Sequence, residues 1–209
     1  KLCKIHIISE IIFVDDNSID GTYEEIKKIK NKKVRGYLRN SKNKDLSKSV
    51  LMGIKKTKNR NILVMDGDMQ HDTEYIKKMW KEFHDSDYDL IVASRFYNKN
   101  YIGNLGPLRS MISRLAISTI NFIFGKLTSD PLSGFFICKK KLIMNYKKYF
   151  FSKGYKILFD ILYNSKKDLK IKDINIKFKK RYFEKSKFNL RIILLFFMQI
   201  LFTKFVVKK

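Results

Sequence analysis

The sequence has 209 residues and a formal net charge of +25, with 45 lysines and arginines against 20 acids. Its hydrophobic content of 44% excludes a disordered chain, and this length suffices for one domain with a sizeable core. Cys3 and Cys138, the only cysteines, form no metal-binding spacing and no disulfide framework, so we expect a reducing compartment. The positive charge suggests an anionic partner: nucleic acid, a membrane surface or a phosphorylated substrate.

Short apolar runs alternate with helical patterns along the first half of the chain. Four runs are short enough to be buried strands, namely EIIFVD (Glu10–Asp15), VRGYL (Val34–Leu38), NILVMD (Asn61–Asp66) and DLIVAS (Asp89–Ser94). Helical patterns lie between them at Tyr23–Lys30, Leu46–Lys56 and Thr73–Phe83. This alternation predicts an α/β fold with a mostly parallel sheet.

The second half is less regular but shows no linker. Helices are expected at Leu108–Phe124 and Tyr155–Asn164, and strands at Phe135–Lys140 and Lys170–Arg181. The apolar run Ile192–Phe202 is too short to span a bilayer and has cationic residues on both sides. We expect it to lie in a membrane interface, with docking on the core or a truncated spanning segment as alternatives. The predicted division is a domain at 1–188 and a membrane-associating helix at 189–209.

Acidic and amide side chains follow two of the predicted strands. Asp15 and Asp16 end the first strand, whereas Asp66, Asp68 and Gln70 follow the third. In open α/β sheets, ligands bind beyond the carboxyl ends of the strands. Because alternate side chains of an extended segment point the same way, the second group is expected to present three oxygen ligands on one side. Such ligands suit Mg²⁺ or Mn²⁺, although a solvated, helix-capping loop would also explain these acids.

The same acids superficially resemble the Mg²⁺-binding acids of bacterial receiver domains. That family has a Met-Pro pair after its phosphorylated Asp, whereas Met69 and Gln70 stand at this place. No Lys-Pro pair follows a last strand, and much of the chain would have no role. We therefore favour another interpretation.

An ordered set of motifs resembles the family 2 glycosyltransferases of the GT-A fold. The motifs are VDDNSIDGT, MDGDMQHD, DLIVASRF, DPLSGFF and KRYFEKSKF, and they extend from about Glu10 to Phe188. The polyprenyl-phosphate (dolichol-phosphate) mannose synthases are the most similar branch, and SDPLSGFF (Ser129–Phe136) is the motif most specific to them. The resemblance implies metal-dependent transfer of mannose, with inversion, from GDP-mannose to a polyprenyl or dolichyl phosphate.

The resemblance also implies roles for residues on the donor side. A metal ion would be held by Asp66, Asp68 and Gln70. The donor nucleotide and its phosphates would be bound by Asp15, Asp16, Arg181 and Lys187. A divalent cation at this place would stabilise the negative charge that develops on a diphosphate leaving group.

The acceptor side follows from the chemistry of a lipid phosphate, which is already anionic and needs charge compensation rather than a strong base. Arg95, Arg109 and Ser113 match the positions that bind this phosphate in the resembling family. Asp130 matches a position near the reaction centre, where it would act in catalysis or orient Arg109 or the sugar. Ordinary turn chemistry would also explain it. The implied catalytic set is Asp68, Asp130 and Arg109.

One expected part of the family pattern is missing. The family opens with a strand and a P-x-Y-N-E loop that holds the nucleotide, so we expect an N-terminally truncated domain that lacks its first strand. A UDP-glucose-dependent polyprenyl-phosphate glucosyltransferase and an inactive remnant are the alternatives. A basic nucleic-acid-binding protein would leave the acids unexplained and lacks an aromatic RNA-binding signature, so we expect no nucleic-acid partner. The expected location is peripheral, at the cytoplasmic face of a membrane.

Overall fold

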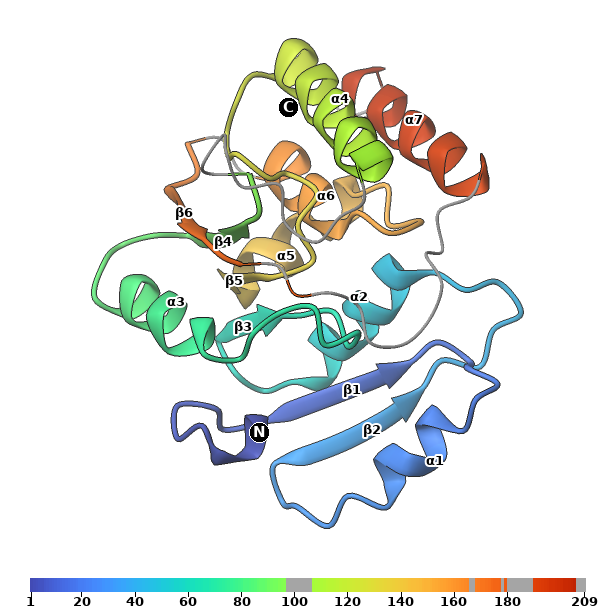
Figure 1. Cartoon of the computed structure of the whole chain (residues 1–209), viewed down its shortest axis with the longest axis vertical. Helices are drawn as coiled ribbons and strands as arrows, with labels where there is room; N and C mark the ends of the chain where they lie inside the picture. The colour runs from blue at the N-terminus through green and yellow to red at the C-terminus, as the bar shows by residue number, and fades with distance from the viewer. Residues whose placement is uncertain (97–106, 166–167, 178, 180–189, 206–209) are drawn as a thin grey trace.

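The computed structural model describes residues 1–96, 107–165, 168–177, 179 and 190–205 (Figure 1). Its strands are β1 (Ile11–Asp15), β2 (Val34–Leu38), β3 (Asn61–Val64), β4 (Leu90–Ser94), β5 (Phe136–Lys139) and β6 (Ile171–Asn175). Its α-helices are α1 (Thr22–Lys27), α2 (Leu46–Lys56), α3 (Tyr75–His84), α4 (Pro107–Phe124), α5 (Lys140–Tyr146), α6 (Ile157–Asn164) and α7 (Leu190–Phe205). Short 3-10 helices lie at Leu2–Lys4 and Lys147–Tyr149. The predicted elements are confirmed in place, except that the strand predicted at Lys170–Arg181 is observed only over Ile171–Asn175 and the end of its predicted range lies outside the described residues. α5 and the 3-10 helices were not predicted.

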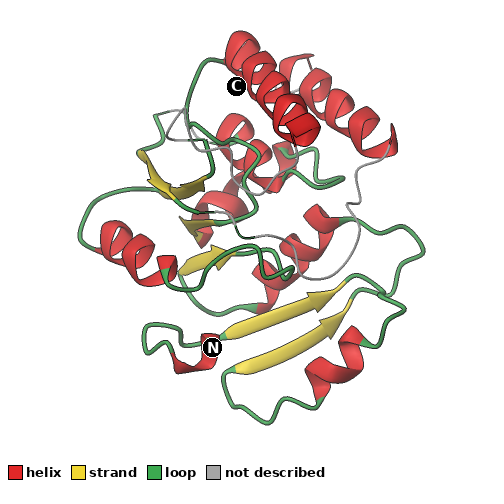
Figure 2. Cartoon of the chain, in the orientation of Figure 1, coloured by secondary structure: helices red, strands yellow, loops and turns green. Residues whose placement is uncertain are grey.

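The strands form two groups, coloured yellow in Figure 2. In one group β1 pairs with β2 in parallel, and the strand order of the other is β3-β5-β4-β6. β4 and β6 are parallel, whereas β5 runs antiparallel to both of its neighbours. The α/β class is confirmed, but of the described sheets only the β1–β2 sheet is wholly parallel, and the four-stranded sheet is mixed. The reason is local: the turn before β5 sends the chain back between β3 and β4.

β4 lies at the centre of the core. All five of its residues are buried, because it has a strand on each edge and helices over both faces. Leu90 and Val92 point into a cluster formed with α4, α6 and α7, while Ile91 and Ala93 point into a second cluster with α3. This alternation is the period of two expected of a strand. Burial on both faces explains why its sequence is a continuous apolar run.

α7 packs one face on the core and leaves another exposed. Its Phe196 ring lies 6.3 Å from the Phe159 ring of α6, and Gln199 Nε2 donates to the Lys156 carbonyl at 3.1 Å. Apolar side chains of α7 that remain exposed are Leu194, Phe197, Met198, Leu201 and Phe205. The alternative in which this helix docks on the core is confirmed, whereas its location in a membrane interface stays a prediction. None of the described helices is long and apolar enough to cross a membrane.

A buried carboxylate holds the turn that leads into α6. Asp160 is fully buried and accepts hydrogen bonds from the backbone N–H groups of Phe151 and Ser152 at 3.1 and 3.0 Å. Asn164 Nδ2 donates to the same carboxylate at 3.0 Å. These hydrogen bonds lower the pKa of Asp160, but burial raises it by more, so its net pKa is above the ordinary value.

We predict that Asp160→Ala lowers the free energy of unfolding by about 2 kcal/mol, because it leaves buried N–H groups without an acceptor. Urea denaturation followed by circular dichroism measures this change. Glu24→Ala on exposed α1 is the control, and we expect it to change stability by less than about 0.5 kcal/mol. Equal stability of the two variants would contradict a structural role for Asp160.

Candidate active site

The acidic residues after β3 lie in a turn rather than in an extended segment. β3 ends at Val64, Met69 has a left-handed φ of 60°, and the N–H of Gln70 donates to Asp68 Oδ1 at 3.1 Å. Our premise of an extended segment therefore fails at Met69, between Asp68 and Gln70, so strand alternation does not align all three side chains. Their role as metal ligands stays a prediction and must rest on the turn geometry.

Asp66 has cationic and hydrogen-bonding neighbours that lower its pKa. His71 Nε2 lies 3.8 Å from Asp66 Oδ2, and the His71 ring packs on Phe135 with 5.0 Å between centroids. Burial raises the pKa of Asp66, but the hydrogen bond and charge of His71 and the cations Lys156 and Arg95 outweigh it. The net pKa is below the ordinary value, so Asp66 is an ionised carboxylate at neutral pH.

Gly134 provides the space in which the Asp66 carboxylate lies. A Cβ atom added to Gly134 would be 2.2 Å from Asp66 Oδ2 and 2.6 Å from its Cγ, which no side chain permits. The glycine of the SDPLSGFF motif is therefore required by close approach of backbone and carboxylate. Sequence analysis quoted this motif but missed the role of Gly134. A glycine directly before a run of bulky residues was the available signal.

The same motif brings a second carboxylate to the end of β4. Asp130 is fully buried and forms a two-pronged ion pair with Arg95, with Nε–Oδ2 at 2.7 Å and Nη2–Oδ1 at 2.9 Å. The backbone N–H of Arg95 also donates to Asp130 at 3.3 Å. Both oxygens of Asp130 are thus engaged. This geometry favours Asp130 as a residue that positions Arg95 over one that contacts substrate.

Asp173 of β6 anchors the start of this motif. Its carboxylate accepts hydrogen bonds from the Ser129 N–H and hydroxyl, both at 2.7 Å, and from the Thr128 hydroxyl. Ser133 then donates to the Ala93 carbonyl at 2.7 Å. Sequence analysis did not single out Asp173. An acid within an alternating strand gives no sign of its distant partner, so no sequence signal was available.

Gln70 links the acidic turn to the chain that follows β6. Its side-chain Nε2 donates to the Lys179 carbonyl at 3.1 Å, and the N–H of Lys179 donates to the Gln70 carbonyl at 2.9 Å. Lys179 Nζ also pairs with Asp72 at 2.5 Å. The amide nitrogen of Gln70 is thus committed to this link. Arg181 and Lys187, predicted to bind the donor, follow this point but lie outside the described residues.

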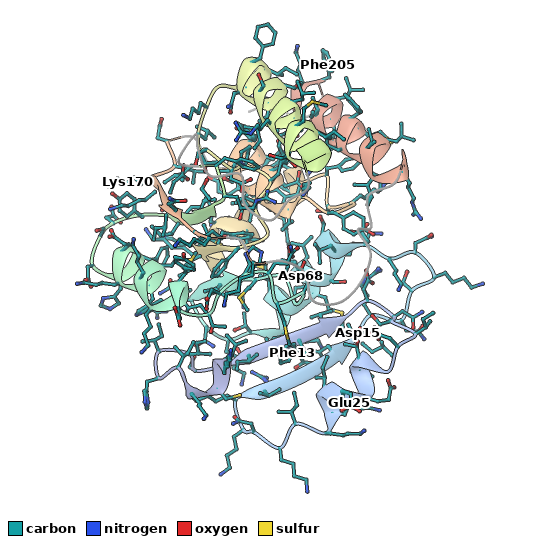
Figure 3. The ribbon with its side chains drawn as sticks, viewed as in Figure 1. Phe13, Asp15, Glu25, Asp68, Lys170 and Phe205 are labelled. Atoms are coloured by element: carbon teal, nitrogen blue, oxygen red, sulfur yellow. The ribbon has the colours of Figure 1, made fainter. Side chains whose placement is uncertain are left out.

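The adjacent acids at the end of β1 have separate local partners. Asp15 is 5% exposed and accepts the Ser18 N–H at 2.9 Å, which closes the turn after the strand. Asp16 pairs with Arg39 and also accepts the N–H of Asp45. Figure 3 labels Asp15 near the end of β1 and Asp68 beyond the end of β3. Nucleotide binding by this pair stays a prediction.

The predicted acceptor residues lie on two elements. Arg95 directly follows β4, while Ser113 is half-buried in α4, whose first turn contains the backbone of Arg109. The Arg95 guanidinium lies 5.2 Å and that of Arg114 5.8 Å from the ring centre of Phe96. Arg114 of α4 and Arg95, which follows β4, thus both lie near the ring of Phe96. Arg114 was not predicted from the sequence.

Comparison with known proteins places this site in a family. The sequence profile of "Glycosyl transferase family 2" matches residues 2–147. The chain belongs to glycosyl transferase family 2. Its matched region contains both acidic strand ends, the Arg95–Asp130 pair and Gly134, whereas Lys156, Asp173 and Lys179 follow the end of that region.

Similar curated proteins and a similar solved structure agree with that assignment. A dolichol-phosphate mannosyltransferase of Pyrococcus furiosus is 32% identical over 75% of this chain and 44% of its own length. One from Saccharomyces cerevisiae is 35% identical over 74% of this chain and 57% of its own length. The chain thus spans about half the length of these curated relatives. A glucosyl-3-phosphoglycerate synthase of Mycobacterium tuberculosis, solved with Mn²⁺ and UDP, shares the fold with a TM-score of 0.71. The two sequences are 13% identical, and the match covers 96% of this chain and 70% of that one.

We predict that Gly134→Ala weakens Mn²⁺ binding by about tenfold or more, because the added methyl group displaces the Asp66 carboxylate. Mn²⁺ titration followed by electron paramagnetic resonance measures this. Gly125→Ala is the matched control: its Cβ would meet nothing within 4 Å, although its φ of 80° makes the change strained. We expect that control to lower stability without changing Mn²⁺ affinity. Unchanged affinity in Gly134→Ala would contradict a metal site at Asp66.

Proposed function

We propose that this family 2 glycosyltransferase domain transfers mannose from GDP-mannose to a polyprenyl phosphate, with inversion. The observation that supports it most is the ionised Asp66, which lies against Gly134 and faces the cations Arg95 and Lys156. Such a place separates an acidic donor side from a basic acceptor side. The similarity to dolichol-phosphate mannosyltransferases supports the choice of sugar and lipid.

A Mg²⁺ or Mn²⁺ ion fits the donor side of this site. Asp66 is ionised and lies in a space that a side chain at position 134 would fill, and carboxylate oxygens are the ligands that hard cations prefer. We infer that Asp66, Asp68 and the side-chain oxygen of Gln70 hold the ion. Among the described residues, no three His, Cys, Asp or Glu side chains gather around one point, so carboxylates alone do not complete the set. When bound, the ion would stabilise the charge of a diphosphate leaving group.

On the acceptor side, the chain has to hold an anionic phosphate close to the sugar. Burial lowers the pKa of Arg95, but the charge and hydrogen bonds of Asp130 and the charge of Asp66 raise it by more. The net pKa is above the ordinary value, so the guanidinium stays charged. Asp130 fixes the orientation of that planar guanidinium, and a fixed guanidinium suits a contact with phosphate oxygens. We infer that Arg95 acts with Arg109 and Ser113 on the acceptor phosphate, and that Asp130 acts through Arg95.

A membrane surface would supply such an acceptor. The exposed apolar side chains of α7 have counterparts on α4, where Met111, Leu115 and Phe122 are exposed. Both helices contribute to one core cluster and lie at the same end of the molecule in Figure 1. Arg114, Arg191 and Lys204 are exposed on these helices. Apolar side chains flanked by cations suit the interface of an anionic membrane, which supports a peripheral location at its cytoplasmic face.

We predict that Asp68→Ala reduces mannose transfer by about 100-fold or more, because it removes a ligand of the charge-stabilising ion. The assay uses the full natural polypeptide with radiolabelled GDP-mannose, Mn²⁺ or Mg²⁺ and polyprenyl phosphate, and counts label extracted into organic solvent. Asp85→Ala at the end of α3 is the control and should retain activity. Turnover unchanged by Asp68→Ala would contradict the metal site.

The same assay separates the proposed function from its alternatives. Label transferred from UDP-glucose but not from GDP-mannose would favour the glucosyltransferase. Transfer from neither donor by the folded protein would contradict the proposed function and favour the inactive remnant.

We predict that the double variant Phe197→Glu, Leu201→Glu binds anionic phospholipid vesicles at least about tenfold more weakly, because two exposed apolar side chains that would enter the membrane are replaced by carboxylates. Sedimentation with vesicles of phosphatidylcholine and phosphatidylglycerol measures this. The matched control is Ile19→Glu, Ile29→Glu, which makes the same charge change at exposed isoleucines on either side of α1. In Figure 1, α1 lies at the opposite end of the molecule from α4 and α7. Equal weakening in both variants would show a charge effect alone and contradict an α7 membrane face.

A further inference from the structure

Lys156, the residue directly before α6, extends its side chain to the turn that joins the two parts of the candidate site. Its Nζ donates to the Leu132 carbonyl at 3.4 Å. Two residues before Leu132 the chain has Asp130, and two residues after it comes Gly134, against which the Asp66 carboxylate lies. The charge of Lys156 is also one of those that lower the pKa of Asp66. The half-buried Lys156 therefore belongs to the site by position, although it follows the region that matches the family profile.

The ion pair at the end of β4 cannot by itself balance the charge of an acceptor phosphate. The Arg95 guanidinium and the Asp130 carboxylate form a two-pronged pair, so together they carry no net charge. A phosphate monoester carries about 1.5 to 2 negative charges at neutral pH. The donor diphosphate would be balanced by the divalent ion of the donor side, whereas the acceptor phosphate needs a further protein cation beside Arg95. The ammonium group of Lys156 supplies such a cation on the same turn.

The backbone of Lys156 is held by α7. Its carbonyl accepts the N–H of Phe159 and the side-chain Nε2 of Gln199, each at 3.1 Å. The first hydrogen bond belongs to the opening turn of α6, and the second comes from a side chain of α7 that is only 1% exposed. A carbonyl oxygen has two lone pairs, so these two donors occupy it fully. The point from which the Lys156 side chain starts is thus determined by both helices.

A second buried polar contact determines where α7 lies along α6. Asn164 Nδ2 donates to the Thr203 hydroxyl at 2.9 Å, and both side chains are buried. Gln199 and Thr203 are four residues apart, so they lie on the same side of α7. Figure 1 shows α7 beside α6. A shift of α7 along α6 would leave buried polar groups of both helices without partners, which opposes any other placement.

We propose that Lys156 is a further phosphate-binding residue of this site, which contacts the acceptor phosphate beside Arg95, and that Gln199 of α7 positions it. The choice of the acceptor as the source of this phosphate rests on the proposed function. Lys156 contacts the ligand, whereas Gln199 acts only through the Lys156 backbone. One hydrogen bond thus connects α7, whose outer side is apolar, to the site.

The first test measures binding of geranyl phosphate to the full natural polypeptide by isothermal titration calorimetry, with geraniol as the ligand that lacks phosphate. Lys156→Met removes the ammonium group and keeps a long side chain. We expect it to bind geranyl phosphate at least about tenfold more weakly, because a charge-assisted hydrogen bond is lost. Lys156→Arg keeps the charge, and we expect its affinity to stay within about threefold of the wild type.

The second test concerns the positioning role of Gln199. Gln199→Met removes the amide donor at similar volume, and we expect about fivefold weaker binding of geranyl phosphate. Thr203→Val is the matched control, because it removes the buried hydrogen bond to Asn164 on the same side of α7 and leaves the contact to Lys156 in place. We expect both variants to lower the melting temperature by similar amounts, and only Gln199→Met to weaken binding. In a Lys156→Met background, Gln199→Met should weaken binding no further, because its effect passes through Lys156.

The opposite results are equally specific. Wild-type affinity for geranyl phosphate in Lys156→Met, or no binding by the wild type, would overturn the proposal and leave Lys156 as a countercharge of Asp66. Weaker binding of GDP with Mn²⁺ in Lys156→Met, at unchanged geranyl phosphate affinity, would assign the residue to the donor diphosphate instead. Equal weakening in Gln199→Met and Thr203→Val would show a general effect of α7 docking and overturn the positioning role of Gln199.

These binding measurements do not depend on sugar transfer. If the folded wild type transferred no mannose but still bound geranyl phosphate through Lys156, the proposed function would fail and the phosphate-binding role would remain. If the wild type transferred mannose and Lys156→Met kept the same KM for polyprenyl phosphate, the proposed function would remain and the role of Lys156 would be overturned.

Discussion

The buried ion pair between Asp130 and Arg95 is the interaction on which the site depends. Asp130 has no exposed surface, and removing one partner of such a pair leaves an uncompensated buried charge, which costs about 3 to 5 kcal/mol. The pair fixes the turn that follows α4 against the end of β4. From that fixed turn the chain continues to Gly134 and into β5, so the ion pair also determines where the backbone meets Asp66.

The contact between Gly134 and Asp66 explains how a chain of such high positive charge keeps an acidic centre. The carboxylate lies against backbone, where no side chain can screen it, and His71, Lys156 and Arg95 keep it ionised. The acidic group Asp66 therefore lies near basic side chains without forming an exposed ion pair with any one of them. This arrangement suits the function that we propose, in which both the donor and the acceptor carry phosphate.

The division of the strands into two groups has a different consequence. β3 to β6 form a continuous sheet with a buried centre, and they carry Asp66, Arg95 and Asp130 with their supporting turns. β1 and β2 carry Asp15 and Asp16, and α2 connects them to the main core through Gly53, whose added Cβ would be 3.3 Å from Val14. The candidate site therefore takes residues from both sheets, because Asp15 belongs to the two-stranded sheet whereas Asp66, Arg95 and Asp130 follow strands or turns of the four-stranded sheet.

Much of the fold follows from the sequence, because apolar runs and helical periods are local patterns. VRGYL and Leu46–Lys56 were predicted with the bounds of β2 and α2, and the motif order identified the family that the profile confirms. Strand direction was not predictable, since nothing within Phe136–Lys139 records that its neighbours run the other way.

The residues that carry the chemistry were largely visible in the sequence, but their partners were not. The sequence by itself determined the family, because acids and arginines at strand ends form a recognisable order, and it predicted that Asp66, Asp68, Arg95 and Asp130 belong to a phosphate-handling site. Only the tertiary structure decided that Asp130 binds Arg95, that Gln70 holds Lys179, and that Gly134 makes room for Asp66. These contacts join residues far apart in the chain, and such pairings are determined by packing in three dimensions.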